Sequence, residues 1–274
     1  MTAGSGIWVP AFAGTTVHEP IDRFGMRYVI VGASAGLGRA LAERLAADKH
    51  DLVLVGRDER DLDAIAADLS LRFGIQSKVL AGDVAQPEML FERLNAVLAA
   101  WTPVDGLLLP IAAASDEDTL DLPQQRIYEI VSVNFLSIIE VIKLVLPYLI
   151  GEGRGVIVGF GSVAAARGRS HNISYSAAKR ALESYFESLR HALGERGIRV
   201  QFYIPGFLDT NLAYGIRTPL PKADPRRLAD TVVRQLGKDF GVRYFPAWWR
   251  PICNALRVAP WSLIRRLSLR HPHE

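Results

Sequence analysis

The sequence predicts an α/β fold in which a doubly wound parallel sheet of about seven strands carries helices on both faces. The first observation is that short apolar segments alternate with helical segments from residue 26 onward. Strands separated by helices of this length form parallel βαβ units with right-handed crossovers. The second observation is that 49% of the 274 residues are hydrophobic. That content supports one substantial core, so a single domain is expected.

The expected elements follow one another in regular order. Strands are predicted at 27–32, 51–55, 77–81, 156–160, 199–203 and 242–245, with a further strand ending near Leu109, and helices at 36–48, 60–73, 87–101, 127–150, 224–235 and from about Ser174 onward. Sheets of this kind bind ligands at the carboxyl ends of their strands, where the strand order reverses. The residues that follow each strand are therefore the candidate site residues.

Composition narrows the class of protein. The only cysteine is Cys253, which excludes an intrachain disulfide and favours a cytoplasmic location. The formal charge of +3 is modest, and no nucleic-acid partner is expected. The six histidines show no spacing that recurs with carboxylates or cysteines, so no metal site is predicted.

The segment 127–150 is apolar nearly all round, which predicts a helix buried on more than one side. A membrane span is the alternative. Four residues that suit a membrane interior poorly favour the buried helix of a soluble domain instead. They are Asn134, Glu140, Lys143 and Pro147.

Residues 1–25 precede the predicted domain, which covers residues 26–246. They carry no basic region and no apolar run of the kind found in a signal peptide or a membrane span. We expect them to be disordered or loosely packed. Met26 stands directly before the first strand, so the segment is either an upstream extension or the product of a mis-assigned start.

A glycine-rich turn joins the first strand to the first helix. Residues 28–39 read YVIVGASAGLGR, with glycines at Gly32, Gly36 and Gly38. Glycines let the backbone approach a pyrophosphate, and a helix N-terminus offers it free amides and a positive dipole end. The spacing differs from the commoner Gly-x-Gly-x-x-Gly fingerprint, and a lone glycine motif is weak evidence for a dinucleotide site.

Tyr175 and Lys179 form the candidate acid–base pair. Ser174 is predicted to cap the helix, which places Tyr175 in its first turn and Lys179 four residues later on the same face. A free phenol has a pKa of roughly 10, and a nearby cation lowers it, so the tyrosine becomes a plausible general acid or base. Ser162, just past a strand end, could hold a substrate carbonyl. The alternative is that the pair are ordinary surface neighbours.

Together the glycine turn, Ser162, Tyr175 and Lys179 resemble the short-chain dehydrogenase/reductase family over roughly residues 26–246. The resemblance implies a Rossmann-type fold and a homodimer or homotetramer. It also implies hydride transfer between a nicotinamide cofactor and a carbonyl compound or secondary alcohol. The expected cofactor is NADP(H), and NAD is also possible. The resemblance further implies that Tyr175 is the acid/base, that Lys179 lowers its pKa and that Ser162 holds the substrate oxygen. An alternative is a dinucleotide-sensing or scaffold protein of the same fold without turnover.

The resemblance also implies a role for Asn134, which matches the family's helix asparagine and would order a relay water between the lysine and solvent. The alternative for Asn134 is an ordinary helix-surface amide. The cofactor-binding residues that the resemblance implies are Gly32, Ser34, Gly36, Leu37, Gly38, Arg57, Asp83, Val84, Ala112, Tyr175, Lys179, Pro205, Gly206 and Thr210.

Arg57 carries the expected preference for NADP. It follows the second strand, where NAD-preferring relatives usually have an acidic residue, and its planar fork matches a 2′-phosphate dianion. The alternative is a solvated arginine within a charge cluster. Ala35 stands where NADP-preferring members often have a second basic residue, so the preference is expected to be partial. Asp83, another expected cofactor-binding residue, also has a purely structural interpretation, as a turn residue before Pro87.

One segment departs from the family pattern. After the fourth strand most members read Asn-Asn-Ala-Gly, whereas this chain reads Leu109-Pro110-Ile111-Ala112. The small side chain of Ala112 leaves room for a cofactor to pass. The missing amides leave the local hydrogen bonding, and hence the nicotinamide placement, unexplained.

A basic amphipathic tail, residues 247–274, follows the predicted domain. From Arg243 to the end the chain holds six arginines and one acidic residue. In a first helical segment, one face carries Trp249, Ile252, Cys253 and Leu256, and another face carries Arg250, Asn254 and Arg257. Pro260 begins a second segment, in which Trp261, Ile264 and Leu267 are set against Arg265 and Arg266. This pattern suits the surface of a membrane, or else packing on the protein's own substrate cleft or on a second subunit. Either arrangement favours a hydrophobic carbonyl substrate over a sugar.

Overall fold

The computed structural model describes residues 25–115, 117–168, 170–210 and 220–268. The predicted extension therefore lies outside the described residues except for Gly25. The mixed glycine, proline and polar residues of 207–223 predict a substrate-covering loop, and the structure describes this segment only in part. The side chains of residues 266–268 are not described.

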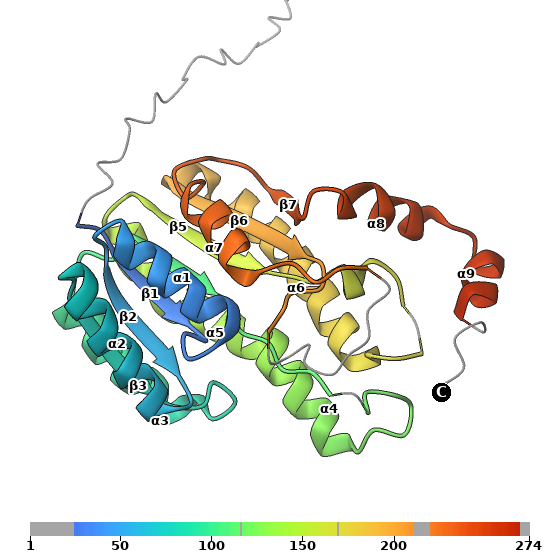
Figure 1. Cartoon of the computed structure of the whole chain (residues 1–274), viewed down its shortest axis with the longest axis horizontal. Coiled ribbons are helices and arrows are strands. Elements are labelled where there is room, and N and C mark those ends of the chain that lie inside the picture. Colours follow the sequence, from blue (N-terminus) through green and yellow to red (C-terminus); the bar gives the residue numbers. More distant parts are fainter. Residues whose placement is uncertain (1–24, 116, 169, 211–219, 269–274) are drawn as a thin grey trace, which may run out of the picture.

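The fold is a seven-stranded parallel sheet, which confirms the predicted fold class (Figure 1). Its strands are β1 (Arg27–Val31), β2 (Asp51–Gly56), β3 (Ser77–Ala81), β4 (Gly106–Leu109), β5 (Gly155–Phe160), β6 (Ile198–Pro205) and β7 (Val242–Phe245). The spatial order is β3-β2-β1-β4-β5-β6-β7. In register, Val29 of β1 lies between Val53 of β2 and Leu107 of β4. The order reverses between β1 and β4, where such sheets bind their ligands.

Helices pack on both faces of this sheet. One face is covered by α1 (Gly36–Ala47), α2 (Glu59–Phe73) and α7 (Pro225–Val233), and the other by α3 (Pro87–Ala100), α5 (Ser137–Gly151) and α6 (Ile173–Leu193). The C-terminal α8 (Trp249–Val258) and α9 (Trp261–Ser268) extend beyond the last strand (Figure 1). Each face has its own buried cluster of aliphatic side chains, because buried parallel strands present apolar residues on both sides.

A long helix runs from Gln124 to Gly151. It consists of α4 (Gln124–Val131), one π-helical turn η1 (Ser132–Leu136) and α5. By length and composition it could cross a membrane, because an 18-residue window within it has a mean hydropathy of 1.9. However, Val141 and Val145 are fully buried in the core on the sheet, so its apolar side is used within the domain.

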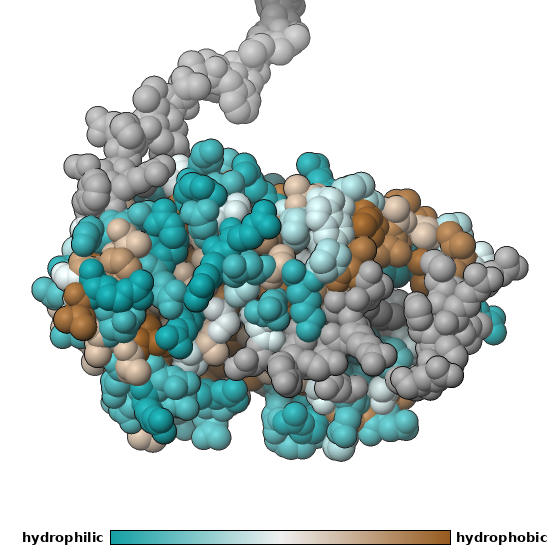
Figure 2. All heavy atoms as spheres, viewed as in Figure 1, coloured by the Kyte–Doolittle hydropathy of each residue, from teal (hydrophilic) through white to brown (hydrophobic). Residues whose placement is uncertain are grey.

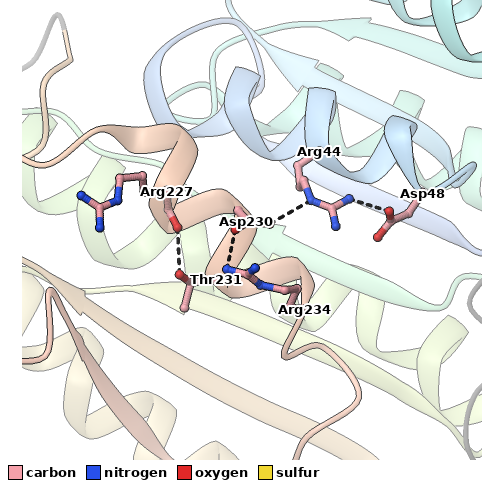
Figure 3. Close-up of polar contacts among 6 residues, drawn as sticks. All are labelled: Arg44, Asp48, Arg227, Asp230, Thr231 and Arg234. Atoms are coloured by element: carbon pink, nitrogen blue, oxygen red, sulfur yellow. Dashed lines mark hydrogen bonds and ion pairs between the residues drawn. The ribbon is translucent and has the colours of Figure 1, made fainter.

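Charged residues join α1 to α7 (Figure 3). Arg44 pairs with Asp48 at 2.5 Å and with Asp230 of α7 at 3.2 Å, and Arg234 pairs with the same aspartate. Such partly exposed pairs contribute about 0–1 kcal/mol each. The network therefore only supplements the apolar packing of α7 on α1, whose buried side chains share one cluster.

Candidate active site

The glycine turn between β1 and α1 places backbone without side chains at the point where the strand order reverses. Gly32 has φ of 97°, which favours glycine, and a Cβ there would lie 3.3 Å from the backbone of Pro110. A Cβ on Gly38 would lie 1.8 Å from the carbonyl oxygen of Gly32, so no side chain fits. Ala35, before α1, has no polar side chain to cap the helix. The first amides of α1 are therefore suited to an anionic ligand.

The segment after β6 lies against this turn. A Cβ on Gly36 would be 3.1 Å from the Cγ2 methyl of Thr210. A Cβ on Gly206 would meet the indole Nε1 of Trp249 at 1.8 Å, so α8 packs directly on the predicted Pro205-Gly206 segment. The structure thus brings Gly36, Gly206 and Thr210 to one edge of the sheet. Leu37 is half-buried against the core below them.

An open hollow lies at the end of β2. Its volume is about 850 Å³, and Ser34, Arg57 and Arg60 line it with three acidic residues. Ser34 sits over the end of β2, because a Cβ on Gly56 would lie 3.2 Å from its Oγ. Arg60 is a second basic residue that the sequence reasoning missed. It lies in the first turn of α2, and its place in the charge cluster 57–60 is the signal that could have indicated it.

Asp83 and Val84 lie after β3, toward the outer end of the sheet. The Asp83 carboxylate accepts a hydrogen bond from the amide of Ala85 at 2.9 Å, and this bond closes a local turn. Gln86, rather than Asp83, is the residue that precedes α3 as its N-cap. Val84 is buried against the core.

Lys179 lies beneath Tyr175 on α6, at the spacing that the sequence predicts. Its ammonium nitrogen is 6.0 Å from the centroid of the Tyr175 ring. It donates hydrogen bonds to the carbonyl oxygens of Ile111, just after β4, at 2.9 Å and Phe160, at the end of β5, at 3.2 Å. The side chain is buried, and this burial lowers the pKa of Lys179 to about 7.

The prediction that Ser174 caps α6 is wrong. The helix begins at Ile173, after Asn172 with φ of 55°, and Ser174 lies inside its first turn. Asp118 in the loop between β4 and α4 provides the cap instead. Its fully buried carboxylate accepts hydrogen bonds from the amides of Ser174 at 3.0 Å and Tyr175 at 2.9 Å. Asp118 therefore fixes the turn that carries the phenol, and a cap from 56 residues away leaves no local signal in the sequence.

Replacing Asp118 by Asn is expected to lower the free energy of unfolding by about 1–3 kcal/mol, because an amide can accept one of the two hydrogen bonds but turns an N–H toward the other donor. Turnover should fall with the loss of order around Tyr175, while the affinity for cofactor changes little. Urea unfolding, and kcat measured beside cofactor Kd, test this. Asp121→Asn in the same loop is the control, because that side chain is exposed. Identical behaviour of the two variants would contradict the positioning role.

Asn134 lies in the π-helical turn and is fully buried, so it is not the surface amide of the alternative interpretation. Its Nδ2 donates to the carbonyl oxygens of Ala113 at 2.6 Å and Ile130 at 2.8 Å, and its Oδ1 accepts from the amide of Ala113 at 3.3 Å. Asn134 and Lys179 thus hold the backbone on both sides of Ala112, in the segment that departs from the family pattern. The relay-water role of Asn134 stays a prediction.

Ser162 lies between β5 and the 3-10 turn η2 (Val163–Ala166). Its Oγ accepts a hydrogen bond from the amide of Ala164 at 3.1 Å. Because that bond uses an oxygen lone pair, the hydroxyl proton can be donated elsewhere. The structure therefore leaves Ser162 able to donate to an oxygen at the carboxyl edge of the sheet.

Comparisons with known proteins identify the family and agree with the fold. The family model described as short chain dehydrogenase matches residues 27–220. A very-long-chain 3-oxoacyl-CoA reductase of Podospora anserina is 31% identical over 229 residues, covering 81% of this chain and 67% of the relative. An uncharacterized oxidoreductase of Staphylococcus epidermidis is 28% identical, covering 82% of this chain and 96% of the relative.

Solved structures show the same likeness. A short-chain dehydrogenase from Sphingobium yanoikuyae in complex with NADPH superimposes with a TM-score of 0.76 at 27% identity, covering 84% of this chain and 93% of the other. A 7beta-hydroxysteroid dehydrogenase superimposes with a TM-score of 0.79 at 20% identity, covering 90% and 98%, and shows the fold alone. The chain therefore belongs to the short-chain dehydrogenase/reductase family and is an NAD(P)-dependent oxidoreductase.

Proposed function

We propose that this enzyme prefers NADP(H) and transfers hydride between the nicotinamide and a carbonyl or secondary alcohol of a hydrophobic substrate. The observation that carries the proposal is the stacking of Tyr175 over the buried ammonium of Lys179 at the switch point of the sheet. The bare turn around Gly32 and Gly38 fits a dinucleotide, because no side chain blocks the backbone there. When bound, the nicotinamide supplies or accepts the hydride.

The protein supplies the proton and holds the substrate oxygen. In reduction Tyr175 donates its phenolic proton to that oxygen, and in oxidation it takes the proton back. A protonated Lys179 below the ring stabilises the phenolate. Ser162 donates its hydroxyl hydrogen bond to the same oxygen, since its Oγ already accepts from Ala164. Asn134 orders a water that links Lys179 to solvent.

The hollow at the end of β2 supports the NADP preference. Arg57 and Arg60 both line it, and two guanidinium groups can bind a phosphate dianion in bidentate fashion. Ser34 adds a hydroxyl donor. The related dehydrogenase from Sphingobium yanoikuyae was solved as a complex with NADPH, which also supports this choice.

Replacing Arg57 by Ala is expected to weaken NADPH binding more than NADH binding, by about 1.5–3 kcal/mol for the loss of a charged hydrogen bond. Titration of both cofactors by fluorescence measures the two dissociation constants. Arg72→Ala is the matched control, because Arg72 is an exposed arginine near the C-terminal end of α2, away from the turn that carries Arg57. Equal losses for both cofactors would remove Arg57 from the 2′-phosphate site.

The side of the site beside Ser162 is apolar. Trp249 and Cys253 of α8 form a buried cluster with Ala166, and Val163 and Phe207 pack against it. These residues surround the turn that follows Ser162 and the segment that follows Gly206. They favour a substrate with an apolar body next to its carbonyl, and several curated relatives are named very-long-chain 3-oxoacyl-CoA reductases.

A panel of carbonyl compounds tests the function. NADPH consumption is followed with 3-oxoacyl thioesters of increasing chain length, apolar ketones and keto sugars. We expect turnover with the apolar compounds and little with the sugars. The alternative is a dinucleotide-sensing or scaffold protein, which the departure at Leu109-Pro110-Ile111-Ala112 favours. NADPH binding without any turnover that depends on Tyr175 would favour the alternative.

The proposal extends to assembly and location. The long helix from Gln124 to Gly151 exposes Tyr128 and Leu136, and apolar side chains of this kind suit a subunit interface. A homodimer or homotetramer formed through this helix and α6 follows from the family resemblance. A cytoplasmic location is proposed from the lone, buried thiol of Cys253.

A further inference from the structure

The corner between α8 and α9 exposes large apolar side chains. We define the α8–α9 corner as Val258, Trp261 and Leu263, whose exposed fractions are 83%, 65% and 51%. Figure 2 shows hydrophobic residues gathered around α8, at the upper right of the visible face. These three residues lie within six positions of one another at the junction of the two helices. Exposed apolar side chains that occur close together mark interaction surfaces.

The surface around the corner is basic. From Pro246 to Ser268 the sequence contains four arginines and neither aspartate nor glutamate. Arg250 on α8 and Arg265 on α9 are exposed. Apolar side chains flanked by arginines are complementary to a surface that is apolar inside and anionic outside.

The corner cannot turn inward without breaking contacts, because α8 is anchored to the domain. Arg257, which the helical spacing predicts on the basic face with Arg250, instead binds Glu183 of α6 through contacts of 2.6 and 2.7 Å. Arg167 donates to the carbonyl oxygen of Arg257 at 3.1 Å. Trp249 is buried on Gly206. One side of α8 thus packs on the protein's own site while the corner beyond it stays exposed.

The anchoring also relates the corner to the active site. Trp249, in the first turn of α8, contacts the segment that follows β6, and α8 packs on η2 directly after Ser162. A surface held by α8 therefore keeps a fixed relation to the apolar side of the site.

We propose that the α8–α9 corner docks the enzyme on an anionic lipid bilayer. Trp261, Leu263 and Val258 enter the interface at headgroup depth, and Arg250 and Arg265 contact lipid phosphates. A second copy of this chain is a weaker candidate, because it would have to supply acidic groups around an apolar recess. The docking does not depend on turnover, so its failure and the failure of the proposed function are distinguishable.

Flotation with vesicles tests the docking, using the full chain without substrate. Vesicles of phosphatidylcholine mixed equally with phosphatidylglycerol are compared with vesicles of phosphatidylcholine alone. We expect the protein to float with the anionic vesicles, and less so as salt is raised. A variant with Trp261→Ser and Leu263→Ser should lose binding by about tenfold or more, since two apolar side chains no longer enter the bilayer interface.

Leu71→Ser is the matched control. Leu71 is 89% exposed on α2, outside the corner, so its replacement should leave flotation unchanged. Arg265→Glu should weaken binding to anionic vesicles. Thermal unfolding checks that each variant is folded. Failure of the wild type to float, or flotation that the double variant leaves unchanged, would overturn the proposal. A double variant that dissociates an oligomer in light scattering, when the wild type does not float, would assign the corner to a second copy.

Discussion

A Tyr175→Phe variant is expected to lose about 10²- to 10⁴-fold in turnover while its affinity for NADPH stays close to that of the wild type. Phenylalanine keeps the ring that lies 6.0 Å from the Lys179 ammonium, and it leaves the amide hydrogen bond to Asp118 in place. Only the phenolic hydroxyl is removed, and with it the proton that is transferred. The expected result is therefore a loss of proton transfer without a loss of fold or of cofactor.

Two measurements are needed for this prediction. NADPH consumption with the best compound of the carbonyl panel gives kcat, and cofactor titration gives Kd. Tyr185→Phe is the control, because Tyr185 is a half-buried tyrosine on the same helix that packs on the core with Phe135 and Phe186. Turnover that persists in Tyr175→Phe at the level of the Tyr185→Phe control would remove Tyr175 from the acid–base role.

The sequence predicts most of the fold because its strands and helices alternate so regularly. The predicted strand at 77–81 coincides with β3, and the predicted helix at 36–48 differs from α1 by one residue. The predicted strand at 199–203 is too short. Ile204 and Pro205 extend β6 because they pair with Tyr244 and Phe245 of β7. A pairing partner far along the chain decides such ends, and periodicity alone does not report it.

The sequence likewise predicts one part of the candidate site and does not reveal another. The spacing of Tyr175 and Lys179 predicts that they stack, since four residues make about one helical turn. It does not reveal the carbonyl oxygens of Ile111 and Phe160 that hold the ammonium, because two strand ends supply them. The cap from Asp118 and the packing of Trp249 on Gly206 are also tertiary contacts. No rule on local spacing connects residues that only the sheet topology brings together.

The second large effect concerns Lys179. A Lys179→Met variant is expected to lose turnover, and its stability relative to the wild type should depend strongly on pH. Burial lowers the pKa of Lys179 from 10.5 to about 7. In the unfolded chain the same lysine titrates near its ordinary value, so between about pH 7 and pH 10.5 the unfolded state binds a proton that the folded state does not. The free energy of unfolding of the wild type therefore gains a term that rises with pH across this window.

Methionine removes the titrating group and with it that term. The variant also loses the hydrogen bonds to Ile111 and Phe160, at a cost of about 1–3 kcal/mol for each unsatisfied carbonyl. That loss varies little with pH. The test is therefore how the difference in the free energy of unfolding between wild type and variant changes with pH, and not its sign at one pH. The free energy of unfolding of the wild type minus that of the variant should increase by roughly 4 kcal/mol between pH 6 and pH 10.

Urea unfolding at a series of pH values measures the difference, with Lys143→Met as the control. Lys143 is exposed on α5, so its replacement should give a difference that is nearly flat with pH. Parallel stability curves for wild type and Lys179→Met would contradict the prediction, because they would mean that Lys179 keeps its ordinary pKa in the folded protein. A rising difference would show instead that the ammonium beneath Tyr175 is held at an energetic cost in the absence of cofactor. The carbonyl oxygens of Ile111 and Phe160 then offset only part of the desolvation of this charge.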